Sequence, residues 1–387
     1  MRNTRCKVVI TGCYSLMHAV VDMSCAVLLS AAAVKAGLTP MQAAAGVIVY
    51  DIVAFALQLP FGAVADRWNK NAVVSAIGCL LVALAFGIQG TGIAACVVAG
   101  LGNALFHVGG GIDVLNISEG KASLPGIYVA TGAMGLYLGT KADDLSLTGW
   151  MMVTALIASA VLLLWVYRKA KRDYGINNAP CTLRFHPERV STSAFVILGC
   201  LLLTICVRGG FGLAMKFSWN NSFEIGLISV SAVVLGKALG GIIGDRLGWL
   251  RTSVTSLGAS AILFFFAYDS MFCGLIALFL FNMTMPITLT ALANLFPRRK
   301  GAAFGATTLA LVGGALPVLF GYRDLFAARP VLIAATAVST LFLWLGLAMY
   351  KTEMETAGTP EEEKGNLPRV GKCGTISPGS TDGRAVR

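Results

Sequence analysis

The chain contains the stretch FGAVADRWNK at residues 61–70 and a second version of it, GGIIGDRLGW, at residues 240–249. A shift of 179 residues takes Asp66 to Asp245 and Arg67 to Arg246. The same shift pairs Gly62 with Gly241, Asn103 with Asn282, Lys121 with Lys300, Gly126 with Gly305 and Gly135 with Gly314. A register that holds without a gap over this length indicates that the chain is two copies of one unit.

The composition is that of a membrane protein. Of 387 residues, 56% are hydrophobic and 13% are charged, whereas soluble proteins carry about 25% charged residues. A membrane-spanning helix needs roughly 20 apolar residues. We therefore expect an all-α polytopic fold of twelve transmembrane helices in two pseudo-symmetric six-helix bundles. The expected spans are 8–34, 42–64, 73–90, 92–112, 122–140, 149–167, 192–215, 222–243, 252–267, 270–293, 301–321 and 329–350.

These spans divide the chain into four regions. Residues 1–167 form the first bundle, 168–191 a basic and polar linker, and 192–350 the second bundle. Residues 351–387 have almost no apolar side chains, so we expect a disordered tail. The apolar segment after residue 7 is too long for a signal-peptide core and contains Asp22, which favours a retained first span.

The net charge of +11 is distributed by side of the membrane. Clusters of Lys and Arg at 168–172 and 298–300 lie in loops expected on one side. The other side holds only Lys35, Lys141, Lys216, Arg323 and Arg329. This positive-inside pattern predicts a multi-pass protein of the plasma (bacterial inner) membrane with both termini in the cytoplasm, and argues against nucleic-acid binding.

Neither a metal site nor a cofactor is expected. The ten cysteines are scattered without a C-x-x-C pair, and the three histidines are far apart in the sequence. The chain has no G-x-x-x-x-G-K-[ST] loop to hold nucleotide phosphates. We therefore expect no enzyme activity, no metal and no disulfide framework.

The repeated stretch also has a physical interpretation. Gly62 and Gly241 allow two helices to approach closely. Asp66 ends a helix near the amino end of the next span, where the helix dipole favours a carboxylate. These residues, with Arg67, Asp245 and Arg246, form a candidate cytoplasmic gate that closes in one state and breaks in another. The alternative is a topogenic loop whose charges are merely hydrated.

The pattern G-x-x-x-D-R after the second span of each half resembles the loop signature of the major facilitator superfamily. The resemblance covers about residues 8–350 and implies transport by rocking of two bundles about a midplane site. Two positions depart from the signature: Asn69 stands where glycine is usual, and Trp249 where a basic residue is usual.

Three segments are similar to fosmidomycin resistance-type exporters. They are CYSLMHAVVD at 13–22, GLGNALFH at 100–107 and NLFPRRKGAAFG at 294–305. That subfamily follows the histidine with Pro-Glu, whereas here VGGGID occupies 108–113. The fifth span, TGAMGLYLGT at 131–140, resembles the antiporter glycine motif through Gly132, Gly135 and Gly139, with Thr140 in place of its proline.

Six ionisable residues fall inside the expected spans, where each charge costs about 2.5–3.5 kcal/mol. The acids and histidines lie in the first half and the bases in the second: Asp22, His18, Asp51, His107, Arg208 and Lys237. Because burial disfavours a charged carboxylate, Asp22, with His18 one helical turn away, is the candidate site for the coupling proton. The alternative is a structural ion pair or a buried hydrogen bond.

Arg208 lies beside Gly209 and Gly210, which can unwind the helix, so it is a candidate for binding an anionic substrate group. Equally, Arg208 or Lys237 can neutralise Asp51 or Asp22 across the halves. The sequence leaves both choices open, and the histidines can be packing groups.

We therefore predict a secondary active transporter, acting as a proton-coupled antiporter for efflux of a small amphiphilic or anionic compound, as in drug resistance. The first alternative is a proton symporter that takes up an organic acid or similar nutrient. The second is a transporter-like sensor or scaffold without turnover. The expected partners are the small-molecule substrate, protons and the lipid bilayer, with the chain acting as a monomer.

Overall fold

The computed structural model describes residues 2–174 and 192–358, and regular structure in these ranges is helical throughout. The first half contains α1 (Arg2–Lys35), α2 (Pro40–Ala56), α3 (Gln58–Trp68), α4 (Asn71–Gly87), η1 (Gln89–Thr91), α5 (Ile93–Ile117), α6 (Ser123–Thr140) and α7 (Gly149–Tyr174). The second contains α8 (Thr192–Ala214), α9 (Phe223–Leu247), α10 (Trp249–Ala267), α11 (Met271–Asn282), α12 (Thr284–Leu295), α13 (Lys300–Pro317), η2 (Val318–Tyr322), α14 (Arg323–Ala327) and α15 (Arg329–Gly358).

Ten helical segments in the described ranges are long and apolar enough to cross a membrane. Three of them join neighbouring helices: Pro40–Trp68 joins α2 and α3, Met271–Leu295 joins α11 and α12, and Lys300–Ala327 runs from α13 to α14. Two of the twelve expected spans are not among these ten segments. They are the third, which corresponds to the 17-residue helix α4, and the fifth, which corresponds to the glycine-rich helix α6. The predicted all-α membrane fold is therefore confirmed, while the count of twelve spans stays a prediction.

Several helices extend past the predicted spans, and α15 runs to Gly358, so it includes the first residues of the predicted tail. Two other extensions change the predicted boundaries. The fourth span was expected to end at 112, but α5 continues to Ile117 and so places Asp113 inside the helix. The sixth was expected to end at 167, but α7 continues to Tyr174 and includes the first residues of the predicted linker. The rest of that linker, and the predicted tail beyond Gly358, lie outside the described residues.

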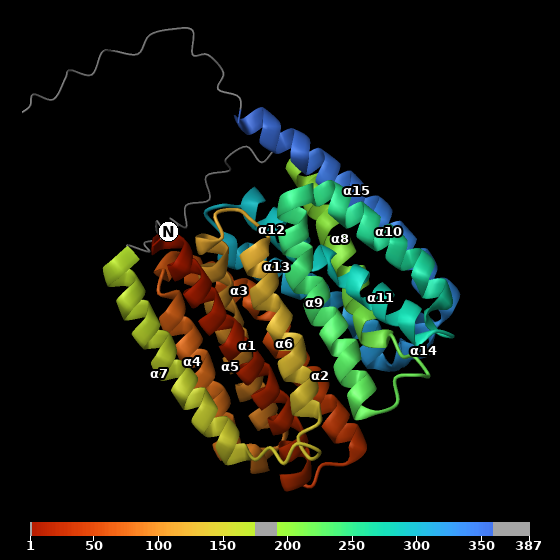
Figure 1. The fold of residues 1–387 in the computed structure, drawn as a ribbon. Coiled ribbons are helices and arrows are strands. Elements are labelled where there is room, and N and C mark those ends of the chain that lie inside the picture. Colours follow the sequence, from red (N-terminus) through yellow and green to blue (C-terminus); the bar gives the residue numbers. More distant parts are fainter. Residues whose placement is uncertain (1, 175–191, 359–387) are drawn as a thin grey trace, which may run out of the picture.

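The helices form two groups that follow the two halves of the sequence, as Figure 1 shows with α1–α7 in red to yellow and α8–α15 in green to blue. The groups meet where α6 packs against α9 and where α3 packs against α13. The 179-residue shift takes α3 to α9 and α6 to α13, so the two contacts are equivalent. In each, the amino-terminal end of a helix of one half meets the motif helix of the other half.

Glycines allow the closest helix packing within the halves. On α6, a Cβ at Gly135 would overlap the carbonyl of Ala19, and one at Gly139 would overlap that of Met23, both on α1. In the second half a Cβ at Gly314 of α13 would overlap the carbonyl of Cys206 on α8. Small residues are the usual way for helices to approach in lipid, where apolar burial alone does not drive association.

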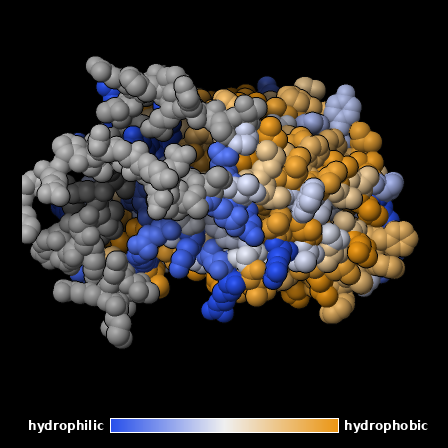
Figure 2. Space-filling view, turned by 90° about the horizontal axis from the view of Figure 1, so that it is seen from above, coloured by the Kyte–Doolittle hydropathy of each residue, from blue (hydrophilic) through white to orange (hydrophobic). Residues whose placement is uncertain are grey.

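The outer surface of the helices is apolar. Large apolar side chains such as Leu16, Trp150, Ile262 and Phe272 are more than half exposed. Figure 2 views the molecule from the end that carries the repeated motifs; hydrophilic residues gather on part of this face, and the opposite side of the view is mostly hydrophobic. This distribution supports a multi-pass membrane protein.

Candidate functional site

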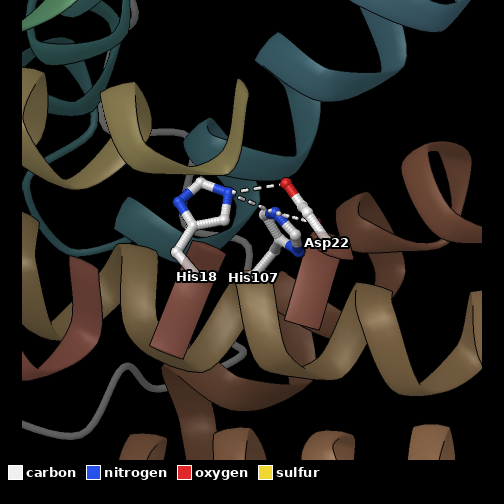
Figure 3. A group of neighbouring side chains, drawn as sticks. All are labelled: His18, Asp22 and His107. Carbon is white, nitrogen blue, oxygen red and sulfur yellow. Dashed lines mark hydrogen bonds and ion pairs between the residues drawn. The ribbon is translucent and has the colours of Figure 1, made fainter. Parts of the chain in front are cut away.

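Two histidines and one acid from different parts of the first half meet inside it (Figure 3). His18 and Asp22 lie one turn apart on α1, with His18 Nε2 3.2 Å from Asp22 Oδ2. His107 of α5 places its Nε2 2.7 Å from His18 Nε2 and 3.6 Å from Asp22 Oδ1. We call His18, Asp22 and His107 the triad.

The backbone fixes how both imidazole rings are protonated. His18 Nδ1 lies 2.8 Å from the carbonyl oxygen of Tyr128, and His107 Nδ1 lies 2.9 Å from that of Asn103. A carbonyl oxygen only accepts hydrogen bonds, so both Nδ1 atoms must carry the proton and donate. Both Nε2 atoms then hold lone pairs when the rings are neutral. Two facing lone pairs at 2.7 Å repel, and a cation between the two Nε2 atoms, of which a proton is the simplest, removes that repulsion.

The carboxylate of Asp22 is also oriented by its neighbours. Asn103 of α5 donates from Nδ2 to Asp22 Oδ1 at 3.0 Å. Gly132 of α6 faces the triad from the third side, because a Cβ there would overlap His18 Nε2 and lie 2.5 Å from Asp22 Oδ2. His18 and His107 are buried, while the side chain of Asp22 is 19% exposed. The glycine therefore leaves room at the point where the triad's ligand atoms converge.

The structure corrects one expectation. No paired histidine site was expected, because the histidines are far apart in the sequence, but His18 and His107, 89 residues apart, are in direct contact. Sequence spacing is informative for ligands on one helix and says nothing about ligands on two helices that cross.

Two further acids of the first half lie outside the triad. Asp51 of α2 is half-buried, and among residues 2–174 and 192–358 no hydrogen bond or ion pair joins it to the triad. Asp113 was not predicted as a site residue; it accepts from Tyr14 Oη at 2.6 Å and from Asn71 Nδ2 at 2.8 Å. The signal for Asp113 was a lone acid after three glycines, which the predicted end of the fourth span at 112 placed in a loop.

The second half contributes two bases. Arg208 of α8 is 8% exposed, and its Nη1 makes only long contacts with the hydroxyls of Thr284 (3.4 Å) and Thr288 (3.3 Å) on α12. Its Nε has no hydrogen-bond partner in the described part of the chain. Lys237 of α9 is half-buried and lies close enough to Arg208 and Asp22 to interact with both through charge.

No direct ion pair joins these bases to the acids of the first half within the described ranges, although neutralisation of Asp22 or Asp51 across the halves was one of the expected alternatives. Arg208 therefore sits in the membrane interior with hydroxyl contacts and no carboxylate partner. Its Nε and remaining Nη donors are available to another group.

The repeated motifs bind the helix ends of opposite halves. Asp66 of α3 accepts from the backbone N–H groups of Gly301 (2.7 Å) and Ala302 (3.0 Å) at the start of α13. Asp245 of α9 accepts from those of Ala122 (2.9 Å) and Ser123 (2.8 Å) at the start of α6. The two contacts are equivalent under the 179-residue shift, which pairs Asp66 with Asp245 and the N–H groups at 122 and 123 with those at 301 and 302. Each carboxylate satisfies unpaired N–H groups at a positive helix end.

The glycines of the motifs mark the same two contacts. A Cβ at Gly62 would overlap the carbonyl of Gly301, and a Cβ at Gly241 would overlap that of Ala122. Asp66 was expected to act on the next span; the helix it caps belongs instead to the other half. Arg67 and Arg246 are exposed.

The two departures from the motif have physical explanations. Asn69 adopts a left-handed conformation (φ 51°, ψ 39°) that ends α3, and its N–H donates to Ala65 O, so asparagine makes the turn that glycine usually makes. Gly248, the equivalent residue, ends α9 at φ 94°. Trp249 donates from Nε1 to Asp245 Oδ1 at 3.0 Å, replacing a cation with a neutral donor.

The span-five glycines lie on the face of α6 toward α1. Gly132 meets the triad, while Gly135 and Gly139 meet backbone carbonyls of α1. The helix runs unbroken to Thr140. These glycines therefore set how closely α6 lies against the triad.

A pocket of about 580 Å³ lies within the second half, and neither the triad nor Arg208 lines it. Its lining includes Arg246, Arg251, Thr252, Thr255 and Met283. It does not correspond to the midplane site that the sequence predicts between the halves.

Neither a family profile nor a curated protein sequence matches the chain. Solved structures do match its fold. A bacterial homologue of the iron transporter ferroportin, in its outward-facing state, shares 15% identity with a TM-score of 0.57, over 89% of this chain and 99% of that one. The human organic anion transporter MFSD10 (TETRAN) shares 12% identity with a TM-score of 0.63, over 90% of this chain and 100% of that one.

A third match is the fucose:proton symporter of E. coli, with 9% identity, a TM-score of 0.57 and coverage of 89% of this chain and 98% of that one. The chain has the major facilitator fold. At these identities the likeness concerns the fold alone; the fosmidomycin resistance-type subfamily stays a prediction.

Proposed function

We propose that the chain is a secondary active transporter that carries a small anionic or amphiphilic compound by alternating access, coupled to a proton. The observation that carries this proposal is the placement of opposite charges in the membrane interior. A triad of two histidines and one carboxylate, with a position for one cation, lies in the first half, and in the described part of the second half a buried arginine has no carboxylate partner.

Arg208 is the candidate substrate contact. A charged group in the membrane interior is costly unless it has a partner, and Arg208 has only two long hydroxyl contacts. A planar guanidinium offers five N–H donors that match a carboxylate or phosphate group. Lys237, close to Arg208, adds a second positive charge. These features favour a substrate with a carboxylate, phosphonate or similar anionic group.

The triad is the candidate proton site. The backbone bonds to both Nδ1 atoms leave the two Nε2 atoms facing each other beside Asp22, and these bonds support our assignment of the proton to that position. Lys237 lies near both Asp22 and Arg208, so the charge state of the triad and the occupancy of the anion site influence each other electrostatically. That interaction is a physical basis for coupling.

The motif contacts are the candidate gate. In this structure Asp66 and Asp245 hold the two halves together at the motif end. We propose that this end faces the cytoplasm, that the contacts break when the site opens to that side, and that the protein is a monomer of the plasma (bacterial inner) membrane.

The direction of transport follows from the resemblance of three segments to fosmidomycin resistance-type exporters, which favours proton-driven efflux. Uptake by proton symport is the alternative, and the fold match to a fucose:proton symporter is compatible with it. A sensor or scaffold with the same fold would bind ligand without flux.

Transport and binding experiments separate these functions. Purified full-length protein is screened for thermal stabilisation by small carboxylates, phosphonates, sugars and amine drugs, and we expect anions to stabilise it most. Compounds that bind are then tested in cells that express the protein. Efflux predicts lower accumulation that an uncoupler restores, and symport predicts accumulation driven by an inward proton gradient. Stabilisation by cations alone, or binding without flux in either direction, contradicts the proposal.

A further inference from the structure

We propose that the triad of His18, Asp22 and His107 is also a binding site for a divalent transition-metal ion, which replaces the proton held there. This site goes beyond the proposed transport of an anion. It requires only the geometry of the first half.

The ligand atoms are placed for a small ion. Two imidazole Nε2 atoms 2.7 Å apart face the Asp22 carboxylate, with His18 Nε2 3.2 Å from Oδ2 and His107 Nε2 3.6 Å from Oδ1. One ligand atom from each residue lies within 4.8 Å of the other two. Ligand atoms about 2.0–2.1 Å from a tetrahedral Zn²⁺ lie roughly 3.3 Å from one another. The two nitrogen–oxygen distances, one to each carboxylate oxygen, lie on either side of that value, and the two nitrogens need to separate by about 0.6 Å to reach it.

The surroundings of the rings are those of metal-binding histidines. A ligating histidine almost always donates its other ring N–H to a carbonyl or carboxylate, which fixes its tautomer and orientation. Both rings do so here, to Tyr128 O and Asn103 O, and Asn103 also holds the Asp22 carboxylate. The ligand set is therefore oriented before any ion arrives.

Space and charge at the site define the ion. Gly132 leaves room where a methyl group would overlap His18 Nε2, so an ion has a place beside the ligand atoms. Two imidazoles and one carboxylate suit Zn²⁺, Co²⁺, Ni²⁺ or Cu²⁺, whereas Mg²⁺ and Ca²⁺ prefer oxygen ligands alone. Lys237 of the other half lies close enough to Asp22 to interact with it through charge, and it opposes the binding of a second positive charge.

The experiment is a Co²⁺ and Zn²⁺ titration of purified full-length protein, with its affinity tag removed, in detergent. We expect one equivalent of Co²⁺ to bind with visible d–d absorption and Zn²⁺ to displace it, while Mg²⁺ does not. His107→Gln or Asp22→Asn should weaken Zn²⁺ binding by at least about 10-fold, since even second-shell changes cost this much at metal sites. Lys237→Gln should tighten binding because it removes the opposing charge.

Matched variants exclude other ligands. His186→Gln removes the remaining histidine of the chain, and Cys25→Ser removes the thiol that lies 3.7 Å from Asn103 Nδ2; both should bind the ion as the wild type does. Gly132→Ala places a methyl group against the ligand atoms and should weaken binding without removing a ligand.

Wild-type protein alone also tests the proposal, should the triad variants fold poorly. Pulsed EPR of one bound Cu²⁺ should show the remote nitrogens of two imidazoles. No binding to the wild type, a spectrum without two imidazoles, or equal Zn²⁺ affinity in well-folded His107→Gln would overturn the metal site. None of these results bears on anion transport, which the flux assays test separately.

Discussion

The contacts at the motif end of the molecule follow the 179-residue repeat, whereas the ionisable residues in the membrane interior do not. At the motif end the halves are equivalent: Asp66 binds the two N–H groups at 301 and 302, and Asp245 binds those at 122 and 123, the same positions under the 179-residue shift. In the membrane interior the repeat fails: one half holds the triad, and the other holds two bases with no ion-pair partner among the residues that the structure describes. Under the proposed function, the duplicated contacts serve the motion of the halves, and the contacts that are not duplicated recognise ions and substrate.

The largest expected effect comes from the acidic side of the centre. Asp22→Asn removes the only carboxylate of the triad, so proton-coupled flux in proteoliposomes should fall to the level of empty liposomes. The matched control is Glu119→Gln, an exposed acid that pairs with Lys7 at 2.5 Å; that ion pair lowers the pKa of Glu119. Glu119→Gln should transport normally. Full coupling in Asp22→Asn would show that the proton binds elsewhere.

Substrate affinity tests the basic side of the centre. Arg208→Gln should weaken binding of the stabilising anion about 10- to 100-fold, because hydrogen bonds to a charged group contribute about 1.5–3 kcal/mol. The control is Arg329→Gln. Arg329 pairs with Asp269, with 2.9 Å between Nη1 and Oδ2, and this pair does not belong to the central site. Isothermal titration gives both affinities. An unchanged affinity in Arg208→Gln would remove the anion assignment.

Amide exchange tests the equivalence of the motif contacts. Asp66→Asn should speed hydrogen exchange at Gly301 and Ala302 and leave Ala122 and Ser123 unchanged. Loss of a charge at a helix end costs about 1 kcal/mol, so the exchange rate of these amides should rise roughly five-fold.

Asp245→Asn should produce the reciprocal pattern, with a smaller change in exchange rate. The effect is smaller because Trp249 Nε1, which donates to Asp245 Oδ1, can still donate to the amide oxygen of the variant and hold it in place. Mass spectrometry of peptides covering 122–123 and 301–302 reads both. Exchange that changes at neither end, or equally at both ends in each variant, would contradict two separate contacts.

The smallest expected effect concerns the turns after the motifs. Asn69 fits its turn because asparagine tolerates φ 51°, ψ 39°, whereas Gly248 at φ 94°, ψ 137° occupies a region open mainly to glycine. Gly248→Asn, which copies the first half, should therefore destabilise the protein by about 1–3 kcal/mol and lower its apparent Tm. Gly258→Ala, in α10 with open space around it, should not. Equal Tm values would show that the two turns are interchangeable.

The internal shift and apolar spacing predicted the all-α fold, the two halves and the residues of both motifs, because these properties are periodic or local. The partners of Asp66 and Asp245 were beyond prediction, since a capped helix 235 residues away depends on how the halves dock. The triad was predictable only in part. His18 and Asp22 share a helix face at i, i+4, whereas His107 joins them only because α1 and α5 cross. Asp113 was missed through an error of five residues in one helix end.

Alternating access is tested most directly by the distance between the equivalent exposed residues Trp68 and Leu247, at the motif ends of α3 and α9. Because the chain has ten cysteines, both positions take a genetically encoded spin-labelled amino acid, and double electron–electron resonance gives the distance distribution. The account predicts two populations, of which the longer grows in an Asp66→Asn, Asp245→Asn double variant, while the Trp68–Glu119 distance within the first half stays single. One population that no variant shifts would contradict the opening of the two halves at this end.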